Sequence, residues 1–572
     1  MDSRDGLRMK MDKPKVMVIG LDGATFKNLR PWMEQGLLPN LKFLIDNGVS
    51  GELETTIPPV SSPAWVSFMT GVNPGKHGVF AFVKPFKDRQ YKKELVTSKD
   101  IKAKTIFEIL SENKKSSGVI NLPMTYPPFQ INGFMISCGL TTPSTGFNFT
   151  YPNDLLEKNA FKRTDYILNI FSGDYSEKEK FFSDLIKWEE QKRDLSFKLM
   201  DDYDWDLFVL IFTGFDRLQH FYWHYIDPTH PKYNSVEAQK ILPLIIKYFQ
   251  RVDSIIGDFI HYIDDNTSLF IISDHGFGPL EKFVDFHLIL KQKHLLYYKN
   301  VSFLDRLNKA QYKLRGTLNQ DSVIYRKTKI FIKTIYFKLR KKEVSIKKLR
   351  KKFIISENYW QKIDWQRTFA YMGVYEDTVY LNVKNRDPEG IINSKEEYLE
   401  SRNNIINLFN NIYDPVHKRT LKVKIYKKEE IYSGPYSDNA PDLCFEIENE
   451  RYQLTSRPYF KKILEDPMQC TGRHTRDGIL IYYGKKIKKN YQIKDSKIID
   501  LAPTILYLLG IKIPEHMDGK ILKDGFEEEF LKNNPVDYEK ISFERKSSAS
   551  DEVYSKQEIE KVEKHLSDLG YI

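Results

Sequence analysis

The chain has 572 residues, of which 41% are hydrophobic and 14% are aromatic. This composition supports a large buried core and excludes a wholly disordered chain, which lacks the apolar residues that offset the entropy lost on ordering. A net charge of +11 is moderate for this length, so it does not by itself indicate a nucleic-acid-binding protein. At about 100–200 residues per domain, the length indicates roughly three or four domains, or one large domain with insertions.

The cysteines and the N-terminal residues bear on the compartment. Cys138, Cys444 and Cys470 are too scattered for a disulfide framework, and they include no Cys-x-x-Cys pair, which favours a reducing compartment. The first 15 residues are polar and charged and lack the apolar region of a signal peptide. Apolar runs such as Leu207–Phe212 are too short to span a bilayer. We therefore expect a cytoplasmic protein.

Three short apolar runs that lead into an aspartate predict buried strands of a parallel sheet. The runs are Val16–Ile19, Leu207–Phe212 and Leu269–Ile272, and the aspartates that follow them are Asp22, Asp216 and Asp274. A single case would carry little weight, because aspartate is common in loops. Three together predict carboxylates that converge on one edge of one sheet, where α/β proteins place their ligands.

Helical patterns at 177–200 and 236–263 alternate with these runs. Such alternation predicts an α/β fold with a mostly parallel sheet sandwiched by helices. We assign residues 14–279 to the first part of this core and residues 280–430 to an insertion or cap. Residues 431–525 are assigned to the second part of the core.

The second part of the core is expected to contain strands at 442–445 and 479–483 and a helix at 499–509. The tail, residues 526–572, is charged and ends in a short helical pattern at 556–569.

Lysine and arginine dominate residues 325–353, with aromatic and aliphatic side chains interleaved, and we expect a largely helical, basic insertion. A stretch of this kind is most often a solvated helix face. The alternatives are a patch for a polyanionic substrate or a peripheral contact with an anionic membrane. No nucleic-acid recognition module accompanies it, and nothing indicates an oligomeric state.

Six residues at or near the strand ends are candidate metal ligands. They are Asp22, Asp216, His220, Asp274, His275 and His474. Asp216 and His220 are four residues apart, so on a helix they share a face and can reach one ion. His474 lies in a Gly-Arg-His-Thr segment that we expect to be a loop. Mixed aspartate and histidine ligation suits zinc or manganese better than calcium or a thiolate-bound structural zinc.

Residues 58–71 contain two serines at the start of a predicted helix that ends at Gly71. A serine at the positive end of a helix can bind a phosphate or stabilise an alkoxide. Ser62 stands beside Pro63 and is the expected N-cap, which leaves Ser61 as the candidate nucleophile, with Ser62 as the fallback. The alternative is that Ser61 is itself only a helix cap.

These motifs, with Thr70-Gly71 and Pro74-Gly75-Lys76-His77-Gly78, occur in the order found in the alkaline phosphatase superfamily. The chain most resembles the type I phosphodiesterase/nucleotide pyrophosphatase branch, and within it the microbial members predicted as phosphohydrolases or phosphomutases. The resemblance covers residues 14–278 and 430–525.

The resemblance implies two divalent ions, zinc foremost and manganese as the alternative. The first ion would be held by Asp22, Ser61, Asp274 and His275. The second ion would be held by Asp216, His220 and His474. Ser61 occupies the place of the nucleophilic Thr or Ser of the branch, which implies a phospho-serine that is then hydrolysed.

Two positions depart from related enzymes. Trp65 stands where the sulfatase signature has an arginine, which disfavours a sulfatase. Phe82 stands where nucleotide pyrophosphatases have an asparagine that contacts phosphate, which indicates a different substrate preference.

We expect a metal-dependent phosphoester hydrolase for a phosphorylated small molecule or a lipid- or sugar-linked phosphate. The alternatives are a phosphomutase or phosphotransferase on the same site, and then a sulfatase or a non-catalytic binding module.

The remaining histidines near these motifs are interpreted as structural. His77 lies in a Pro-Gly-Lys-His-Gly segment that is more often a structured turn than a substrate contact. His224, His230 and His287 are expected to be structural or exposed, with pocket lining as the alternative for residues 220–224.

Overall fold

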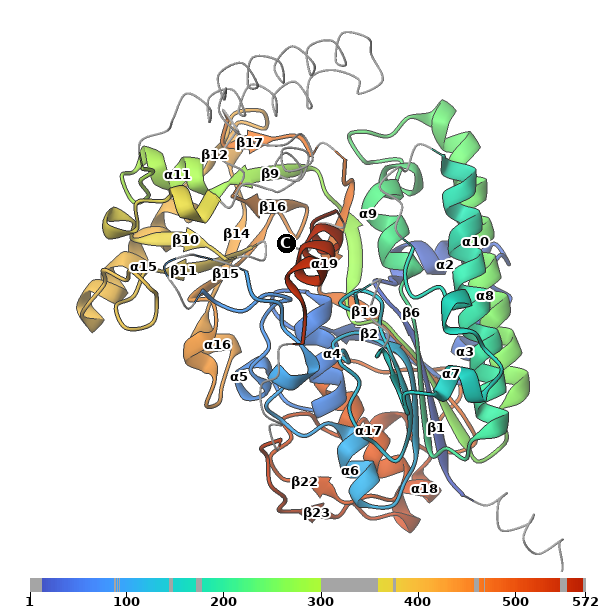
Figure 1. The fold of residues 1–572 in the computed structure, drawn as a ribbon. Coiled ribbons are helices and arrows are strands. Elements are labelled where there is room, and N and C mark those ends of the chain that lie inside the picture. The colour runs from blue at the N-terminus through green and yellow to red at the C-terminus, as the bar shows by residue number, and fades with distance from the viewer. Residues whose placement is uncertain are drawn as a thin grey trace, which may run out of the picture.

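A computed structural model of the protein describes most of the chain. The described residues are 13–86, 89, 91, 93–143, 148–170, 177–299, 359–373, 377–456, 462–467, 469–545 and 553–568. The basic stretch 325–353, with its expected helix and membrane contact, lies outside these residues. Within them, every helix is too short or too polar to cross a bilayer. Two large sheets organise the described chain, and three two-stranded sheets accompany them (Figure 1).

The main sheet has ten strands, and its centre is parallel. The order is β20 (Tyr491–Gln492), β2 (Val49–Glu54), β19 (Asp477–Tyr483), β7 (Thr267–Ile272), β1 (Lys15–Leu21), β6 (Leu207–Phe212), β3 (Ser117–Leu122), β4 (Gly133–Ser137) and β5 (Thr150–Tyr151), with β21 (Ser496–Lys497) beside β2. Strands β7, β1, β6, β3 and β4 run parallel, and β19 is antiparallel to both of its neighbours. The three predicted strands are therefore confirmed as the neighbouring β1, β6 and β7.

Helices cover both faces of this sheet (Figure 1). One face carries α2 (Phe26–Glu34), α3 (Pro39–Asn47), α8 (Lys178–Asp202) and α10 (Ser235–Tyr262). The other face carries α4 (Ser61–Thr70), α6 (Ile106–Glu112) and α17 (Leu501–Leu508). The central strands are buried along their whole length, because a parallel sheet covered on both faces takes continuous apolar runs. The predicted sandwich of sheet and helices is confirmed.

The second sheet has seven strands and its own hydrophobic core. The order is β10 (Ala370–Met372), β11 (Thr378–Leu381), β15 (Leu443–Ile447), β16 (Tyr452–Thr455), β9 (Lys282–Asp285) and β17 (Leu464–Glu465), with β14 (Val423–Lys427) beside β15. Helices α11 (Phe286–Gln292) and α15 (Lys395–Asn410) pack with it. Phe286 and Phe409 of these helices stack with ring centroids 5.4 Å apart.

The second sheet adds to one expectation and corrects another for the described residues. Within 280–430, helices α11 and α15 are present as expected, and strands β9, β10, β11 and β14 also lie in this range. The strand expected at 442–445 is β15 of the second sheet, and the chain returns to the main sheet at β19. The Val-Lys-Ile-Tyr-Lys alternation of β14 has the two-residue period of a strand, which the basic composition of the segment obscured.

Residues 553–568 pack against the main core. The helix expected at 556–569 is α19 (Lys556–Asp568), and its Val562 and Leu566 are buried in the main hydrophobic cluster. The Tyr554 hydroxyl, just before the helix, donates to the Thr141 carbonyl at 2.8 Å.

Candidate active site

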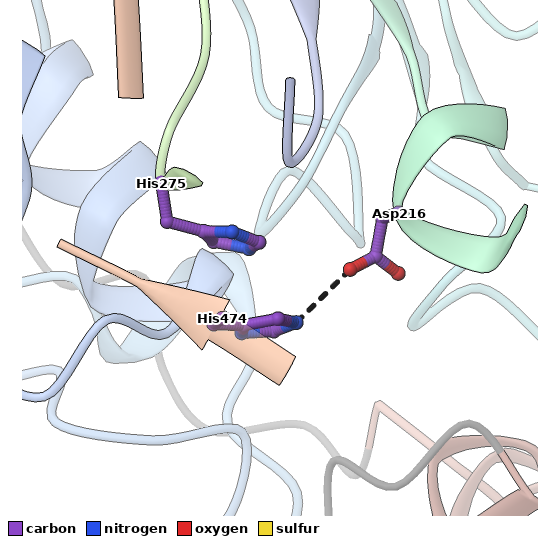
Figure 2. Close-up of side chains that lie close together, drawn as sticks. All are labelled: Asp216, His275 and His474. Atoms are coloured by element: carbon purple, nitrogen blue, oxygen red, sulfur yellow. Dashed lines mark hydrogen bonds and ion pairs between the residues drawn. The ribbon is translucent and has the colours of Figure 1, made fainter. Parts of the chain in front are cut away.

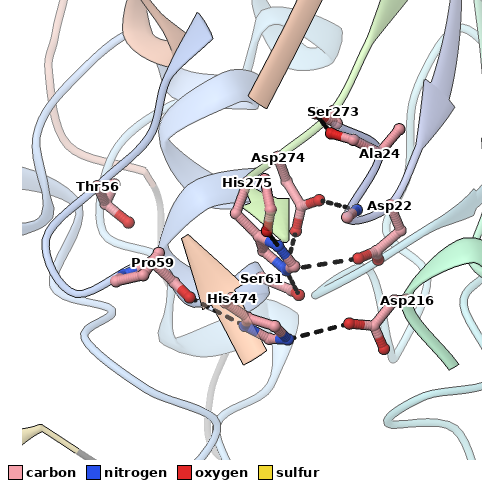
Figure 3. Close-up of polar contacts among 12 residues, drawn as sticks. Asp22, Ala24, Thr56, Pro59, Ser61, Asp216, Ser273, Asp274, His275 and His474 are labelled. Atoms are coloured by element: carbon pink, nitrogen blue, oxygen red, sulfur yellow. Dashed lines mark hydrogen bonds and ion pairs between the residues drawn. The ribbon is translucent and has the colours of Figure 1, made fainter. Parts of the chain in front are cut away.

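Three strand ends of the main sheet bring buried carboxylates together (Figure 3). Asp22 follows β1 directly, Asp274 lies two residues beyond β7, and Asp216 lies in the first turn of α9 (Gly214–Ile226), which follows β6. Strand β1 pairs in parallel with both β6 and β7, so the carboxyl ends of the three strands meet at one edge. All three aspartates are at most 2% exposed. The convergence that the sequence predicted is confirmed.

His474 reaches this edge from a separate two-stranded sheet. It lies in β18 (Gly472–Thr475), which pairs antiparallel with β8 (Gly276–Pro279). The expected loop is thus a strand, because residues 472–475 find hydrogen-bonding partners in the residues that follow His275. The rings of His275 and His474 stack with centroids 3.7 Å apart (Figure 2).

The three candidate histidine ligands share one orientation. Each lies with Nδ1 near a backbone carbonyl: His220 at 3.3 Å from Gly472, His275 at 3.0 Å from Gly276, and His474 at 3.0 Å from Pro59. A carbonyl oxygen only accepts, so Nδ1 donates in each case and Nε2 is left with its lone pair facing the site. Metal-ligating histidines are held in this way. Because these acceptors are backbone atoms, no signal in the side-chain sequence points to them.

The candidate ligands form two overlapping groups. Ligand atoms of Asp22, Asp274 and His275 lie within 4.8 Å of one another, as do those of Asp216, His275 and His474. His220 joins the second group, with Nε2 3.3 Å from Asp216 Oδ1 and 3.0 Å from His474 Nε2. Figure 2 shows His474 directed at Asp216, with Nε2 3.0 Å from Oδ1. His275 lies between the groups, whereas the resemblance assigned it to the first ion alone.

The electrostatics of the groups favour a bound cation. Burial raises the pKa of Asp22 well above its usual value and that of Asp274 to about 7, and the nearby Asp216 charge raises both further. Burial lowers the pKa of His275 to about 4 and that of His474 to about 3. Buried carboxylates in such proximity repel one another unless a cation lies between them.

The residues present fit divalent metal ions. Asp22 Oδ1 and Asp274 Oδ2 are buried and accept no hydrogen bond from the described residues. His275 Nε2 lies 3.6 Å from the first oxygen and 3.3 Å from the second. Carboxylate oxygens and neutral imidazole nitrogens are the donor set that zinc and manganese accept.

Ser61 lies beside both groups, at the start of α4. Its Oγ is 3.1 Å from His275 Nε2, and its side chain is fully buried. The N-cap of α4 is Val60, whose extended backbone precedes the helix, so neither serine caps it and the expectation for Ser62 is wrong. Ser62 is already helical, and its Oγ has no hydrogen-bond partner among the described residues. The interpretation of Ser61 as a cap alone is therefore not supported.

The other singled-out residues have structural surroundings. His77 is fully buried, with Nε2 3.0 Å from Ser67 Oγ and Nδ1 accepting from the Val79 amide at 3.2 Å. Three further histidines contact groups outside the ligand groups: His224 with Thr471 Oγ1 at 2.9 Å, His230 with the Leu280 carbonyl at 3.2 Å and His287 with the Tyr298 hydroxyl at 2.9 Å. Trp65 and Phe82 are fully buried in the main core.

Comparison with known proteins places the chain in a family. The model of the type I phosphodiesterase/nucleotide pyrophosphatase family matches residues 16–477, well over half of the chain. No curated protein is similar enough to be matched.

Several solved structures are similar at low sequence identity. Human ectonucleotide pyrophosphatase/phosphodiesterase 5 is 13% identical, with 90% of this chain and 100% of that chain covered and a TM-score of 0.47. An inactive form of the murine enzyme in complex with AMP is 13% identical over 87% of this chain and 96% of that chain, with a TM-score of 0.44. Phosphonoacetate hydrolase from Sinorhizobium meliloti 1021, in complex with phosphonoacetate, is 13% identical over 87% of this chain and 96% of that chain, with a TM-score of 0.47. On the family match, the chain belongs to the type I phosphodiesterase/nucleotide pyrophosphatase family, within the alkaline phosphatase superfamily, and is a phosphoester hydrolase.

Proposed function

We propose that this protein hydrolyses phosphodiesters at a site for two divalent metal ions, with Ser61 as the nucleophile. The observation that carries the proposal is the common orientation of three histidines around the aspartates. Each donates Nδ1–H to a backbone carbonyl, which leaves three Nε2 atoms facing the buried carboxylates and the Ser61 hydroxyl.

The ligand assignment follows the two groups. The first ion would be held by Asp22, Asp274 and His275, and the second by Asp216, His220 and His474. Zinc is the preferred ion and manganese the alternative, because both accept mixed oxygen and nitrogen ligands. When bound, the ions would lower the pKa of the Ser61 hydroxyl and offset negative charge on the phosphate.

The chain itself supplies the nucleophile and its surroundings. Ser61 Oγ attacks phosphorus and the P–O bond to the leaving alcohol breaks, so that the alcohol leaves with the proton given up by the Ser61 hydroxyl and a phospho-serine that keeps the second ester group forms. Water then cleaves the Ser61 O–P bond and releases a phosphate monoester. Ser61 is the first residue of α4, and the N–H groups of Ser61 and Ser62 have no intrahelical acceptors and are suited to bind phosphate oxygens. Every residue of helix α4, including Trp65, is buried, which holds the hydroxyl in place.

The test compares three esters with and without metal. Turnover of bis-p-nitrophenyl phosphate, p-nitrophenyl phosphate and p-nitrophenyl sulfate is measured with zinc, with manganese and after chelation. We expect metal-dependent turnover of the diester that falls at least about 1,000-fold in Ser61→Ala. Ser62→Ala is the matched control, since it removes a neighbouring buried hydroxyl, and it should retain turnover. Undiminished turnover in Ser61→Ala would contradict the proposal, and faster monoester turnover would replace the diesterase with a phosphatase.

A further inference from the structure

Helix α9, which carries Asp216 and His220, begins without a cap of its own. Its N-cap residue, Thr213, makes no side-chain capping bond, and Thr213 Oγ1 is buried with no hydrogen-bond partner among the described residues. The first N–H groups of a helix have no intrahelical acceptor and need one from elsewhere when they are buried. The start of α9 therefore depends on a group outside the helix.

Glu189, in the middle of α8, supplies that acceptor. Its Oε1 accepts from the Gly214 amide at 3.0 Å and from the Tyr248 hydroxyl of α10 at 3.1 Å. A carboxylate at this place also interacts favourably with the positive end of the α9 dipole. Glu189 is 25 residues from Gly214 in sequence, so it acts as a cap that only the packing of α8 on α9 brings into place.

Lys192 compensates the charge of this carboxylate. Its Nζ donates to Glu189 Oε2 at 2.6 Å and lies 3.3 Å from the centroid of the Trp188 ring. The side chains of Glu189 and Lys192 are 0% and 1% exposed. A buried charge is costly unless it is paired and hydrogen-bonded, and here both carboxylate oxygens are used.

Gly214 makes the close approach of Glu189 to the backbone possible. A Cβ atom at this position would lie 2.6 Å from Glu189 Oε1 and 2.2 Å from the Tyr248 hydroxyl. Any side chain at Gly214 would therefore push the carboxylate away from the amide that it caps. Asp216 stands two residues further along the same turn.

Stability alone does not account for this arrangement. Replacing a buried ion pair with well-packed apolar side chains of similar size is often neutral or stabilising. We propose that Glu189 and Lys192 are a positioning pair, which holds the first turn of α9 so that Asp216 and His220 face the second ion. Neither residue is among the candidate metal ligands, and the inference rests on the proposed two-metal function.

The first test is Glu189→Gln, which removes the charge and keeps the size of the side chain. The matched control is Glu190→Gln on the next residue of α8, where Glu190 Oε1 pairs with Arg251 at 2.7 Å and is about one third exposed. Zinc and manganese binding to the full chain is measured by titration calorimetry after chelation and dialysis. We expect the wild type and Glu190→Gln to bind two ions. Glu189→Gln should bind the second ion at least tenfold more weakly than the wild type does.

A second variant separates positioning from folding. Glu189→Leu with Lys192→Met replaces the ion pair by apolar side chains, and thermal unfolding is recorded beside metal binding. We expect the double variant to unfold at a temperature equal to or above that of Glu189→Gln. Its affinity for the second ion should still be at least tenfold lower than that of the wild type. Two ions bound with wild-type affinity in both variants would overturn the positioning role and leave the proposed function intact. A wild-type protein that binds no divalent ion would overturn the proposed function and the inference with it.

Discussion

Arg473 of β18 and Asp377, the residue before β11 of the second sheet, form a buried ion pair next to a candidate metal ligand. Arg473 Nη2 lies 2.6 Å from Asp377 Oδ2, and the side chains are 6% and 4% exposed. The second oxygen of Asp377 accepts from the Leu454 amide at 2.8 Å, and Arg473 also donates to the Tyr452 carbonyl. Since His474 is the next residue after Arg473, its place relative to Asp216 depends on the second sheet.

Asp377→Asn should destabilise the protein by about 3–5 kcal/mol, because it leaves the Arg473 guanidinium buried without its counter-charge. The free energy of unfolding is measured by denaturant titration. The matched control is Asp466→Asn, which removes an exposed partner of Lys282 at 2.6 Å and should cost at most about 1 kcal/mol. Equal losses of unfolding free energy in the two variants would show that the buried Arg473–Asp377 pair stabilises the protein no more than an exposed ion pair does.

Chelation should lower the thermal midpoint by several degrees, because the three buried aspartates then lack a cation. Ligand linkage gives about 2.7 kcal/mol of stabilisation when free zinc is 100 times its dissociation constant. The midpoint is measured by calorimetry with zinc and with a chelator. Asp216→Asn should reduce the shift, and Asp466→Asn should preserve it. A thermal midpoint that is the same with zinc and with chelator would contradict the proposed metal site.

Stability should fall as the pH drops below 6.5, in part through His77. Burial lowers the pKa of His77 to about 3 in the folded protein. His77 is therefore protonated near pH 6.5 in the unfolded chain but only near pH 3 in the folded protein, so acid favours unfolding. Between pH 7 and pH 5 this group alone should cost about 2 kcal/mol. Unfolding free energies at the two pH values are compared for the wild type and His77→Gln. The same loss in both proteins would rule out His77 as the source.

Gly214→Ala should destabilise the protein by about 1–3 kcal/mol, the usual cost of an inserted methyl group in a packed core. The nearest atom to the new Cβ would be the Tyr248 hydroxyl oxygen, at 2.2 Å. Adding Tyr248→Phe removes that atom and should recover part of the loss. The four unfolding free energies of this double-mutant cycle measure the coupling, and strictly additive values would show that the hydroxyl is not what the new methyl group meets.

The sequence by itself determined the local elements of the site. Each of the strands β1, β6 and β7 is a short apolar run that leads into an aspartate, so both the strand and the carboxylate are visible within ten residues of sequence. The Asp216–His220 spacing likewise places two candidate ligands on one helix face, because residues four apart on a helix are neighbours. The order of these motifs along the chain was sufficient to identify the family.

Only the tertiary structure decided how these residues are held. The Pro59 carbonyl that orients His474 is 415 residues away from it, and Asp377 is 96 residues from Arg473. Strand β15 lies in the second sheet because it pairs with β11 and β14, and nothing in the sequence of residues 443–447 indicates these partners. Glu189 is an ordinary helical glutamate by its sequence neighbours, and it becomes a cap for α9 only where α8 packs against the end of β6. Long-range packing and backbone acceptors leave no local pattern, so the sequence predicts which side chains the site uses but not what fixes their positions.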